Sequence, residues 1–214
     1  MKHNSEQLSD EAASIQKARQ GSATDWELLV LAHQQPVFRY AYLLCGDADE
    51  AEDIAQEAFI RAYHALGRFD ETRPLRPWLL RITANLAHNR RRSAARYLAA
   101  LHRLVRSEPA SGMKIEEKTA QNLQHRGLRE AVQGLPEDDR QIIYLRYFLD
   151  LSVEETAAAE GIAVGTVKSR LHRALNRLRQ CIQKDYPELI ESEPGWTNPN
   201  WTSWKYAWWR LPAR

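Results

Sequence analysis

The segment from Val164 to Arg179 carries side chains that are suited to contact DNA. It contains five basic residues and no acidic residue. On a helical wheel its apolar residues form one stripe, and its polar and basic side chains occupy the other faces. A DNA major groove accepts such a helix, and Arg, Lys and Ser side chains reach both phosphates and base edges there. The apolar stripe comprises Val164, Val167, Leu171, Ala174, Leu175 and Leu178, the opposite face Thr166, Ser169, Arg173, Asn176 and Arg177, and the flanks Lys168, Arg170 and His172.

The residues before this helix predict the turn that would present it. Ser152 and Glu155 have the spacing of a capping box, so we expect a short helix to begin there. Gly161 supplies a turn in which a positive φ costs little, and a second helix begins near Val164. Together these elements form a helix-turn-helix unit; the alternative is an ordinary basic amphipathic helix. Ala163 occupies the expected N-cap, where Ser, Thr, Asn or Asp would stabilise the helix more.

A second cationic segment, Arg76 to Arg92, indicates contact with unstacked bases. It contains five arginines and no acid, and Phe69 to Pro77 is expected to form a loop that leads into a helix from Trp78 to Arg92. Aromatic rings stack on bases, amides hydrogen-bond to them and arginines hold phosphates. The alternative places the aromatic rings in the core and the arginines in water. We favour core packing for Trp78, and nucleic-acid contact for Asn85 and Arg90 to Arg92.

An acidic segment precedes these cationic ones. Cys45 to Glu57 contains six acids and no base, and we expect a helix from Asp49 to Leu66 with one apolar face. The opposite face sets Ile60 among acids, which suits docking on a basic protein surface. A merely solvated face is equally compatible with these residues. The apolar face comprises Ala51, Ile54, Ala55, Ala58, Phe59, Ala62 and Leu66, and the opposite face Asp49, Asp53, Glu57, Ile60 and His64.

The pattern as a whole predicts an all-α fold of two small modules. Ala, Leu, Arg, Glu and Gln dominate, and β-branched alternation is absent. We expect one module over 11–92, a flexible linker over 93–122, a helix-turn-helix module over 123–186 and a Trp-rich tail over 187–214. Helix breaks are expected at 21–22, 46–47, 67–77, 134–136, 150–152 and 160–161. The first core is expected to include Trp26, Phe38, Tyr42, Phe59, Tyr63 and Trp78.

Composition argues against several other classes of protein. The net charge is only +2, and no apolar run is long enough for a membrane span or a secretion signal. Cys45 and Cys181 are too few for a disulfide framework and lack zinc-ligand spacing, so a reducing cytoplasm is expected. No carboxylate cluster, reactive Ser or Tyr constellation or phosphate-binding Gly loop is present. We therefore expect a protein that is not an enzyme and that needs no cofactor, metal or small-molecule substrate.

Three blocks of the sequence resemble the extracytoplasmic-function (ECF) sigma factors, which are alternative sigma subunits of bacterial RNA polymerase in the sigma-70 family. Glu50 to Tyr63 is similar to their polymerase-docking helix, and Trp78 to Ala87 looks like the helix that opens the −10 promoter element. Leu135-Pro136 with Gly165 to Leu175 resembles their −35-reading module. The similarity spans about residues 11 to 186 apart from the linker. The tail departs from the family pattern, in which the chain commonly ends near the close of the helix-turn-helix.

The resemblance implies a function and a set of partners. The chain would direct core polymerase to specific promoters and help to open the −10 element without hydrolysis, because binding of unstacked bases offsets the cost of unpairing. The implied partners are the clamp helices of the largest polymerase subunit, the flap of the second-largest subunit, promoter DNA and an anti-sigma factor. Only through that anti-sigma protein would the chain meet a membrane.

The resemblance also assigns site residues. Those that would bind polymerase are Asp53, Gln56, Glu57 and Ile60. Those that would contact the −10 element are Phe69, Arg73, Leu75, Arg76, Trp78, Asn85, Asn89, Arg90, Arg91 and Arg92. Those that would contact the −35 element are Thr166, Lys168, Ser169, Arg170, His172 and Arg173.

Two other functions are compatible with parts of this sequence. A stand-alone repressor or activator would bind duplex DNA tightly without polymerase, and it would leave the acidic helix without a role. A nucleic-acid enzyme such as a recombinase has no catalytic cluster in its favour.

For the tail we rank packing against the chain's own modules first, a docking or autoinhibitory role second and membrane-interface contact third. Its tryptophans are Trp196, Trp201, Trp204, Trp208 and Trp209.

Overall fold

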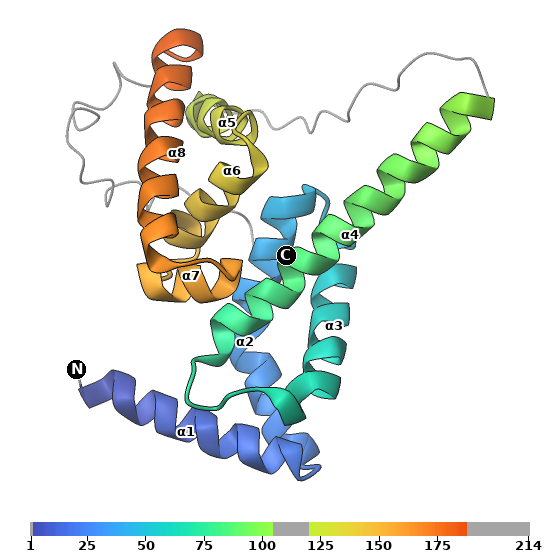
Figure 1. The fold of residues 1–214 in the computed structure, drawn as a ribbon, viewed down its shortest axis with the longest axis vertical. Helices are drawn as coiled ribbons and strands as arrows, with labels where there is room; N and C mark the ends of the chain where they lie inside the picture. The colour runs from blue at the N-terminus through green and yellow to red at the C-terminus, as the bar shows by residue number, and fades with distance from the viewer. Residues whose placement is uncertain (1, 105–119, 188–214) are drawn as a thin grey trace. The chain divides into compact units, whose positions relative to one another are not determined.

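A computed structural model describes residues 2–104 and 120–187 and gives side-chain burial for 10–97 and 127–187. The regular secondary structure of these residues is all helical, with short turns and loops between the helices. Contacts group helices α1 to α4, together with residues 154–162, into one compact unit and α5, α6 and α8 into another (Figure 1). The predicted all-α class is confirmed. Residues 105–119 of the predicted linker and residues 188–214 of the predicted Trp-rich tail lie outside the described residues.

The first unit is built from four helices whose ends follow the predicted breaks. The Ser22 hydroxyl accepts a hydrogen bond from the Asp25 N–H at 3.3 Å, so a helix begins after Ser22. Gly46 ends that helix with a φ of 79°, and the Asp47 carboxylate caps the next helix through the Glu50 N–H at 2.8 Å. The elements are α1 (Lys2–Arg19), α2 (Ala23–Cys45), α3 (Ala48–Ala65), the 3₁₀ turn η1 (Leu66–Arg68) and α4 (Leu75–Leu104).

Aliphatic side chains and the ring of Tyr40 fill the core of this unit, and the aromatic rings that the sequence predicted for it lie at its edge. α3 packs on α2 and α4 through buried alanines, which bring the helix axes close and leave little space for rings. The predicted aromatic core is therefore wrong for Tyr63, whose side chain is 43% exposed. The rings of Trp26, Phe38, Tyr42, Phe59 and Trp78 are half-buried. The core itself includes Ile15, Leu29, Val37, Tyr40, Ile54, Leu66, Leu79 and Leu80.

Helix α4 is longer at both ends than the sequence predicts. It begins at Leu75 rather than Trp78, because proline is compatible with the first turn of a helix and Pro77 therefore does not delay it. It also continues beyond Arg92 to Leu104, through a segment rich in Ala, Leu and Arg, which favour helix. Part of the predicted linker is thus helical, and α5 (Ala120–Gln133) occupies its last residues.

The second unit packs α8 (Val164–Asp185) against α5 and α6 (Glu137–Ile143). A π-helical turn, η2 (Tyr144–Phe148), follows α6. Further along the chain α7 (Val153–Glu160), whose residues from Glu154 onward group with the first unit, begins directly after Ser152, as expected from the capping-box spacing. Gly161 has a φ of 68°, so the glycine turn before α8 is confirmed. The buried apolar side chains include Leu128, Val132, Ile142, Leu145, Leu149, Leu151, Val167, Ala174, Leu178 and Ile182.

The predicted apolar stripe of α8 is only partly buried. Val167, Ala174 and Leu178 are buried and Leu171 and Leu175 are half-buried, whereas Val164 is 36% exposed. A helical side chain covers the turn that precedes its own Cα. Val164 has no preceding helical turn, so the buried stripe begins at Val167.

Ala163 occupies the N-cap of α8 and makes no side-chain cap hydrogen bond. Its φ of −69° and ψ of 147° are those of an N-cap residue, so a serine there can accept a hydrogen bond from the first turn. We expect Ala163→Ser to stabilise the protein by about 1 kcal/mol. Thermal unfolding followed by circular dichroism measures this as a melting temperature raised by a few degrees.

The matched control is Ala158→Ser, which makes the same substitution at an exposed position inside α7. Serine has a lower helix propensity than alanine and caps nothing there, so a small loss of stability is expected. An unchanged or lower melting temperature for Ala163→Ser would contradict the cap geometry.

Candidate nucleic-acid interface

The loop between η1 and α4 (residues 69–74) is held in shape by its own polar groups. The Asp70 carboxylate accepts hydrogen bonds from the Thr72 hydroxyl at 2.6 Å and the Thr72 N–H at 3.1 Å. The Arg73 guanidinium lies 3.1 Å from the same carboxylate. The Thr72 hydrogen bonds, and then the nearby Arg73 charge, lower the pKa of Asp70 below its ordinary value. Asp70, Thr72 and Arg73 are all exposed, so this turn presents a polar and charged edge to solvent.

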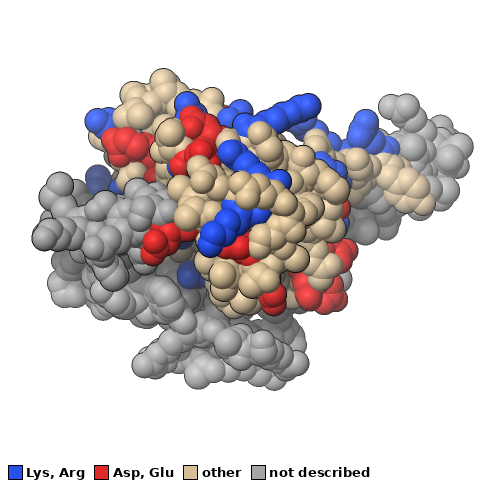
Figure 2. Space-filling view, turned by 90° about the horizontal axis from the view of Figure 1, so that it is seen from below, with Lys and Arg blue, Asp and Glu red and all other residues tan. Residues whose placement is uncertain are grey.

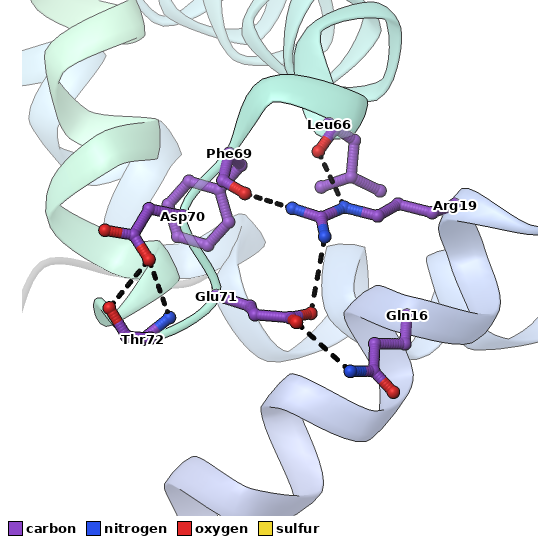
Figure 3. Close-up of polar contacts among 7 residues, drawn as sticks. All are labelled: Gln16, Arg19, Leu66, Phe69, Asp70, Glu71 and Thr72. Atoms are coloured by element: carbon purple, nitrogen blue, oxygen red, sulfur yellow. Dashed lines mark hydrogen bonds and ion pairs between the residues drawn. The ribbon is translucent and has the colours of Figure 1, made fainter.

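Helix α1 holds the start of this loop. Figure 3 shows the Arg19 guanidinium between the Leu66 carbonyl, the Phe69 carbonyl and the Glu71 carboxylate. Its Nε donates to the Leu66 carbonyl at 2.9 Å, and its Nη1 donates to Glu71 Oε2 at 3.3 Å. Gln16 donates to the other Glu71 oxygen at 3.1 Å. A single residue of α1 thus binds the first residue of η1 and the loop that follows η1.

Helix α1 also binds the residue at which the loop ends. Glu11 Oε2 accepts a hydrogen bond from the Leu75 N–H at 3.1 Å, and Glu11 Oε1 lies 2.8 Å from His33 Nε2. Although burial acts to raise the pKa of Glu11, the hydrogen bonds from His33 and from the Leu75 N–H lower it overall. Glu11 therefore places a carboxylate at the N-terminus of α4, which has no acidic residue in its own first turn.

The structure separates the residues predicted for the −10 element into buried and exposed groups. Leu75 is fully buried, and Phe69 is 8% exposed with its ring centroid 4.8 Å from that of Trp78. Phe69 and Leu75 are therefore buried in this conformation. Arg76, Trp78 and Arg90 are half-buried, and the exposed members are Arg73, Asn85, Asn89, Arg91 and Arg92.

The outer face of α3 combines one apolar side chain with acids. Ile60 is 54% exposed, and Asp53 and Gln56 are exposed beside it along the helix. Glu57 is half-buried and pairs with Arg61 at 2.7 Å. The inner face is buried at Ala51, Ile54, Ala55, Ala58 and Ala62, so the predicted division of this helix into two faces is confirmed.

The outer face of α8 presents the residues predicted for the −35 element. Lys168, Ser169, His172 and Arg173 are exposed, and Thr166 and Arg170 are half-buried. Arg170 is paired with Asp138 of α6 at 3.2 Å, and Arg177 forms an ion pair with the buried Asp139. These two arginines therefore join α8 to α6, while Arg173 projects from the exposed face.

Cationic and acidic side chains are interspersed on the face of the protein seen in Figure 2. Figure 2 shows Lys and Arg side chains interspersed with Asp and Glu side chains rather than gathered in one block. Several of the predicted DNA-contacting arginines have acidic neighbours, as in the Arg90–Asp53 pair at 3.5 Å. Such exposed pairs contribute little to stability and exchange readily, so they can give way to phosphate.

Sequence reasoning missed the residues that position the loop. Glu11, Gln16 and Arg19 lie on α1, more than 50 residues before Glu71 and Leu75, and no local spacing links them. Asp70 and Thr72 carried a usable signal, because an Asp two residues before a Thr commonly forms an Asx turn. Among the residues that the structure describes, no group of His, Cys, Asp and Glu could hold a metal ion.

Two helical units, with an exposed basic face on the helix that follows a glycine turn, are typical of a DNA-binding transcription factor. Comparison with known proteins narrows that class. The family description Sigma-70 region 2 matches residues 29–97, and Sigma-70, region 4 matches residues 125–178.

Curated relatives cover most of the chain. The RNA polymerase sigma-H factor of Pseudomonas aeruginosa is 34% identical over 183 residues, which are 79% of this chain and 92% of the relative. The ECF RNA polymerase sigma factor SigW of Bacillus subtilis is 32% identical over 181 residues, 79% of this chain and 95% of the relative. The solved structure of the sigma factor RpoE with the anti-sigma factor NepR from Bartonella quintana has a TM-score of 0.62 at 26% identity, covering 76% of this chain and 99% of that one.

The chain therefore belongs to the ECF sigma factors of the sigma-70 family. It is an alternative sigma factor that directs RNA polymerase to promoters, so the repressor and recombinase alternatives are set aside. Within the described residues no helix is long and apolar enough to cross a membrane.

Proposed function

We propose that three separate surfaces of this sigma factor divide the work of promoter recognition. The outer face of α3 docks on the clamp helices of the largest polymerase subunit through Asp53, Gln56, Glu57 and Ile60. The observation that carries this proposal is the placing of the 54% exposed Ile60 among exposed acids on one face of α3, an arrangement that suits docking on a basic protein surface. The acids provide complementarity to a basic partner and raise the rate of association.

The loop of residues 69–74 and the first turns of α4 contact the −10 element. Unstacked bases bind to exposed polar groups and to arginines, and that binding offsets the cost of unpairing the duplex. Arg73, Asn85 and Asn89 are exposed for this role, and Arg90 to Arg92 meet the adjoining phosphates. Phe69 and Leu75 support the loop from the core side.

The exposed face of α8 reads the −35 element. Lys168, Ser169, His172 and Arg173 lie on one exposed side of the helix that follows the glycine turn. Thr166 and Arg170 support them from the edge of that face. The functional modules are then 11–92 and 123–186, joined by the linker 93–122, and the second also contacts the flap of the second-largest subunit.

An anti-sigma factor is a further partner in this proposal. The sigma factor RpoE of Bartonella quintana, which is 26% identical, was solved with the anti-sigma factor NepR. We infer that this chain acts in the cytoplasm as a regulator of transcription and not as an enzyme. Any link to a membrane would then run through the anti-sigma protein.

Transcription in vitro from a promoter library tests the proposal. Purified core polymerase is mixed with the full chain, and the transcripts are sequenced to find which −35 and −10 bases are preferred. The proposal expects one promoter class that depends on the chain, and duplex binding by the chain alone that is much weaker than binding with core. Tight duplex binding without core, together with no promoter selection, would overturn it.

A further inference from the structure

Helix α1 caps both helices that flank the loop of residues 69–74. The Arg19 guanidinium binds the carbonyl of Leu66, which begins η1 and also accepts the Phe69 N–H at 3.1 Å, and the carbonyl of Phe69, which directly follows η1. The first N–H groups of α4 likewise lack helical partners, and the Glu11 carboxylate accepts one of them from Leu75. A cation at a helix C-terminus and an anion at a helix N-terminus both match the helix dipole.

The two capping residues are fixed relative to each other. Ile15 and Ala18, which lie between them along α1, are only 1% and 2% exposed, so α1 is anchored in the core in a single register. Eight residues of α-helix place Glu11 and Arg19 about 12 Å apart along the axis. Helix α1 therefore sets the separation of the loop's two ends.

The same helix also binds the middle of the loop. Glu71 receives hydrogen bonds from both Arg19 and Gln16, so its side chain is held toward α1 (Figure 3). Asp70 and Arg73 are more exposed and are joined by an ion pair on the outer edge of the loop. The loop thus has an inner side bound to α1 and an outer side available to a ligand.

We propose that Glu11, Gln16 and Arg19 of α1 are positioning residues for base selection at the −10 element, because they hold the base-contacting loop in one conformation. This inference rests on the proposed role of that loop in contacting −10 bases. A loop held in its bound shape loses less conformational entropy on binding, and it discriminates between bases better than a loop that adapts to each. Helix α1 itself touches no DNA in this scheme.

Base preference at the −10 element is the readout that tests the inference. The full chain, with core polymerase and a library that varies each −10 position, is compared with Arg19→Gln and Glu11→Gln. Both variants are expected to reduce the preference for the best base at one or more −10 positions by about fivefold to tenfold. Preferences at the −35 element and affinity for core should stay within about twofold, the range expected of distant sites that act independently.

The matched control is Lys17→Gln, which removes a cation from the same helical turn as Arg19. Lys17 is 64% exposed and pairs only loosely with Asp25, at 3.8 Å, so its loss should leave the preference unchanged. Base preference is the ratio of the transcript yields from two templates measured with one protein preparation. A partly unfolded variant lowers the yield from every template alike, so this ratio stays the same. A merely structural role of α1 would therefore give reduced yield without altered preference.

The loop variant Arg73→Ala separates the two ways in which the inference can fail. If Arg73→Ala changes −10 preference and both α1 variants do not, the loop contacts bases but α1 does not position it. If Arg73→Ala also leaves the preference unchanged, the loop does not select bases, and the proposed −10 role and the positioning role fail together.

Discussion

Core polymerase is expected to bind the paired variant Asp53→Ala/Glu57→Ala roughly 30-fold more weakly than the unaltered chain. Both acids lie on the outer face of α3, one and two turns from the exposed Ile60. When these acids are truncated, the basic groups that they meet on the partner are left unpaired. This loss costs about 2 kcal/mol of binding free energy for the two acids together. Fluorescence anisotropy of labelled chain titrated with core polymerase measures the affinity.

The fold should tolerate the two substitutions. The ion pairs that are lost, Asp53 with Arg90 and Glu57 with Arg61, are largely exposed, and each contributes at most about 1 kcal/mol. Alanine also has the highest helix propensity, so α3 itself is not weakened. A thermal melt close to that of the unaltered chain would show that the loss of affinity comes from the docking face.

The matched control is Glu27→Ala/Glu154→Ala, which removes the same charge from exposed positions outside α3. Glu27 lies on α2 and Glu154 on α7, so this pair should change core affinity less than threefold. Raising the salt concentration should shrink any difference that arises from long-range charge. Equal losses from both pairs would mean that overall charge, and not the face around Ile60, governs the association.

Local signals were sufficient to predict most helix boundaries. Ser22, Gly46, Asp47 and Gly161 act within a few residues of themselves, through caps and a positive φ, so their effects can be deduced from neighbouring sequence. The two faces of α3 and the stripe of α8 follow from helical periodicity. The N-cap at Ala163 was predicted for the same reason.

Long-range contacts explain what the sequence did not predict. The N-terminal cap of α4 comes from Glu11, which lies 64 residues before Leu75, so no neighbouring residue in the sequence signals it. The aromatic residues were expected in the core because of their size, but the buried alanines of α3 leave them at its edge. Which neighbouring element covers each position cannot be deduced from the periodicity of a single helix.

The candidate site shows the same division. Helical periodicity places Ile60 and Arg173 on exposed faces, and the structure confirms that exposure. A loop has no such periodicity, so nothing in its sequence separated Phe69 and Leu75, which face inward, from Arg73, which faces outward. Ion pairs between elements, such as Arg170 with Asp138, are likewise visible only in the folded chain.

A second large effect is expected from Arg173→Ala, which should reduce selection of one −35 base pair by about tenfold. Arg173 is exposed on α8, whereas Arg170 and Arg177 on the same helix are engaged with Asp138 and Asp139. Its guanidinium is therefore available to bind a base edge with two hydrogen bonds, which contributes about 1–3 kcal/mol of discrimination. Transcription from a library that varies the −35 element measures the preference at each position.

The distinguishing feature is the position dependence of the loss. If Arg173 contacts a base, its removal relaxes the preference at one −35 position and leaves the −10 preferences intact. If Arg173 contacts a phosphate, its removal weakens binding to all sequences alike. Arg179→Ala, which removes an exposed arginine from a later turn of α8, should leave the −35 preference unchanged. A uniform loss in Arg173→Ala would reassign that arginine to the DNA backbone. No loss at all would mean that Arg173 makes no contact with DNA, even though the buried stripe at Val167, Ala174 and Leu178 leaves its side of the helix outward.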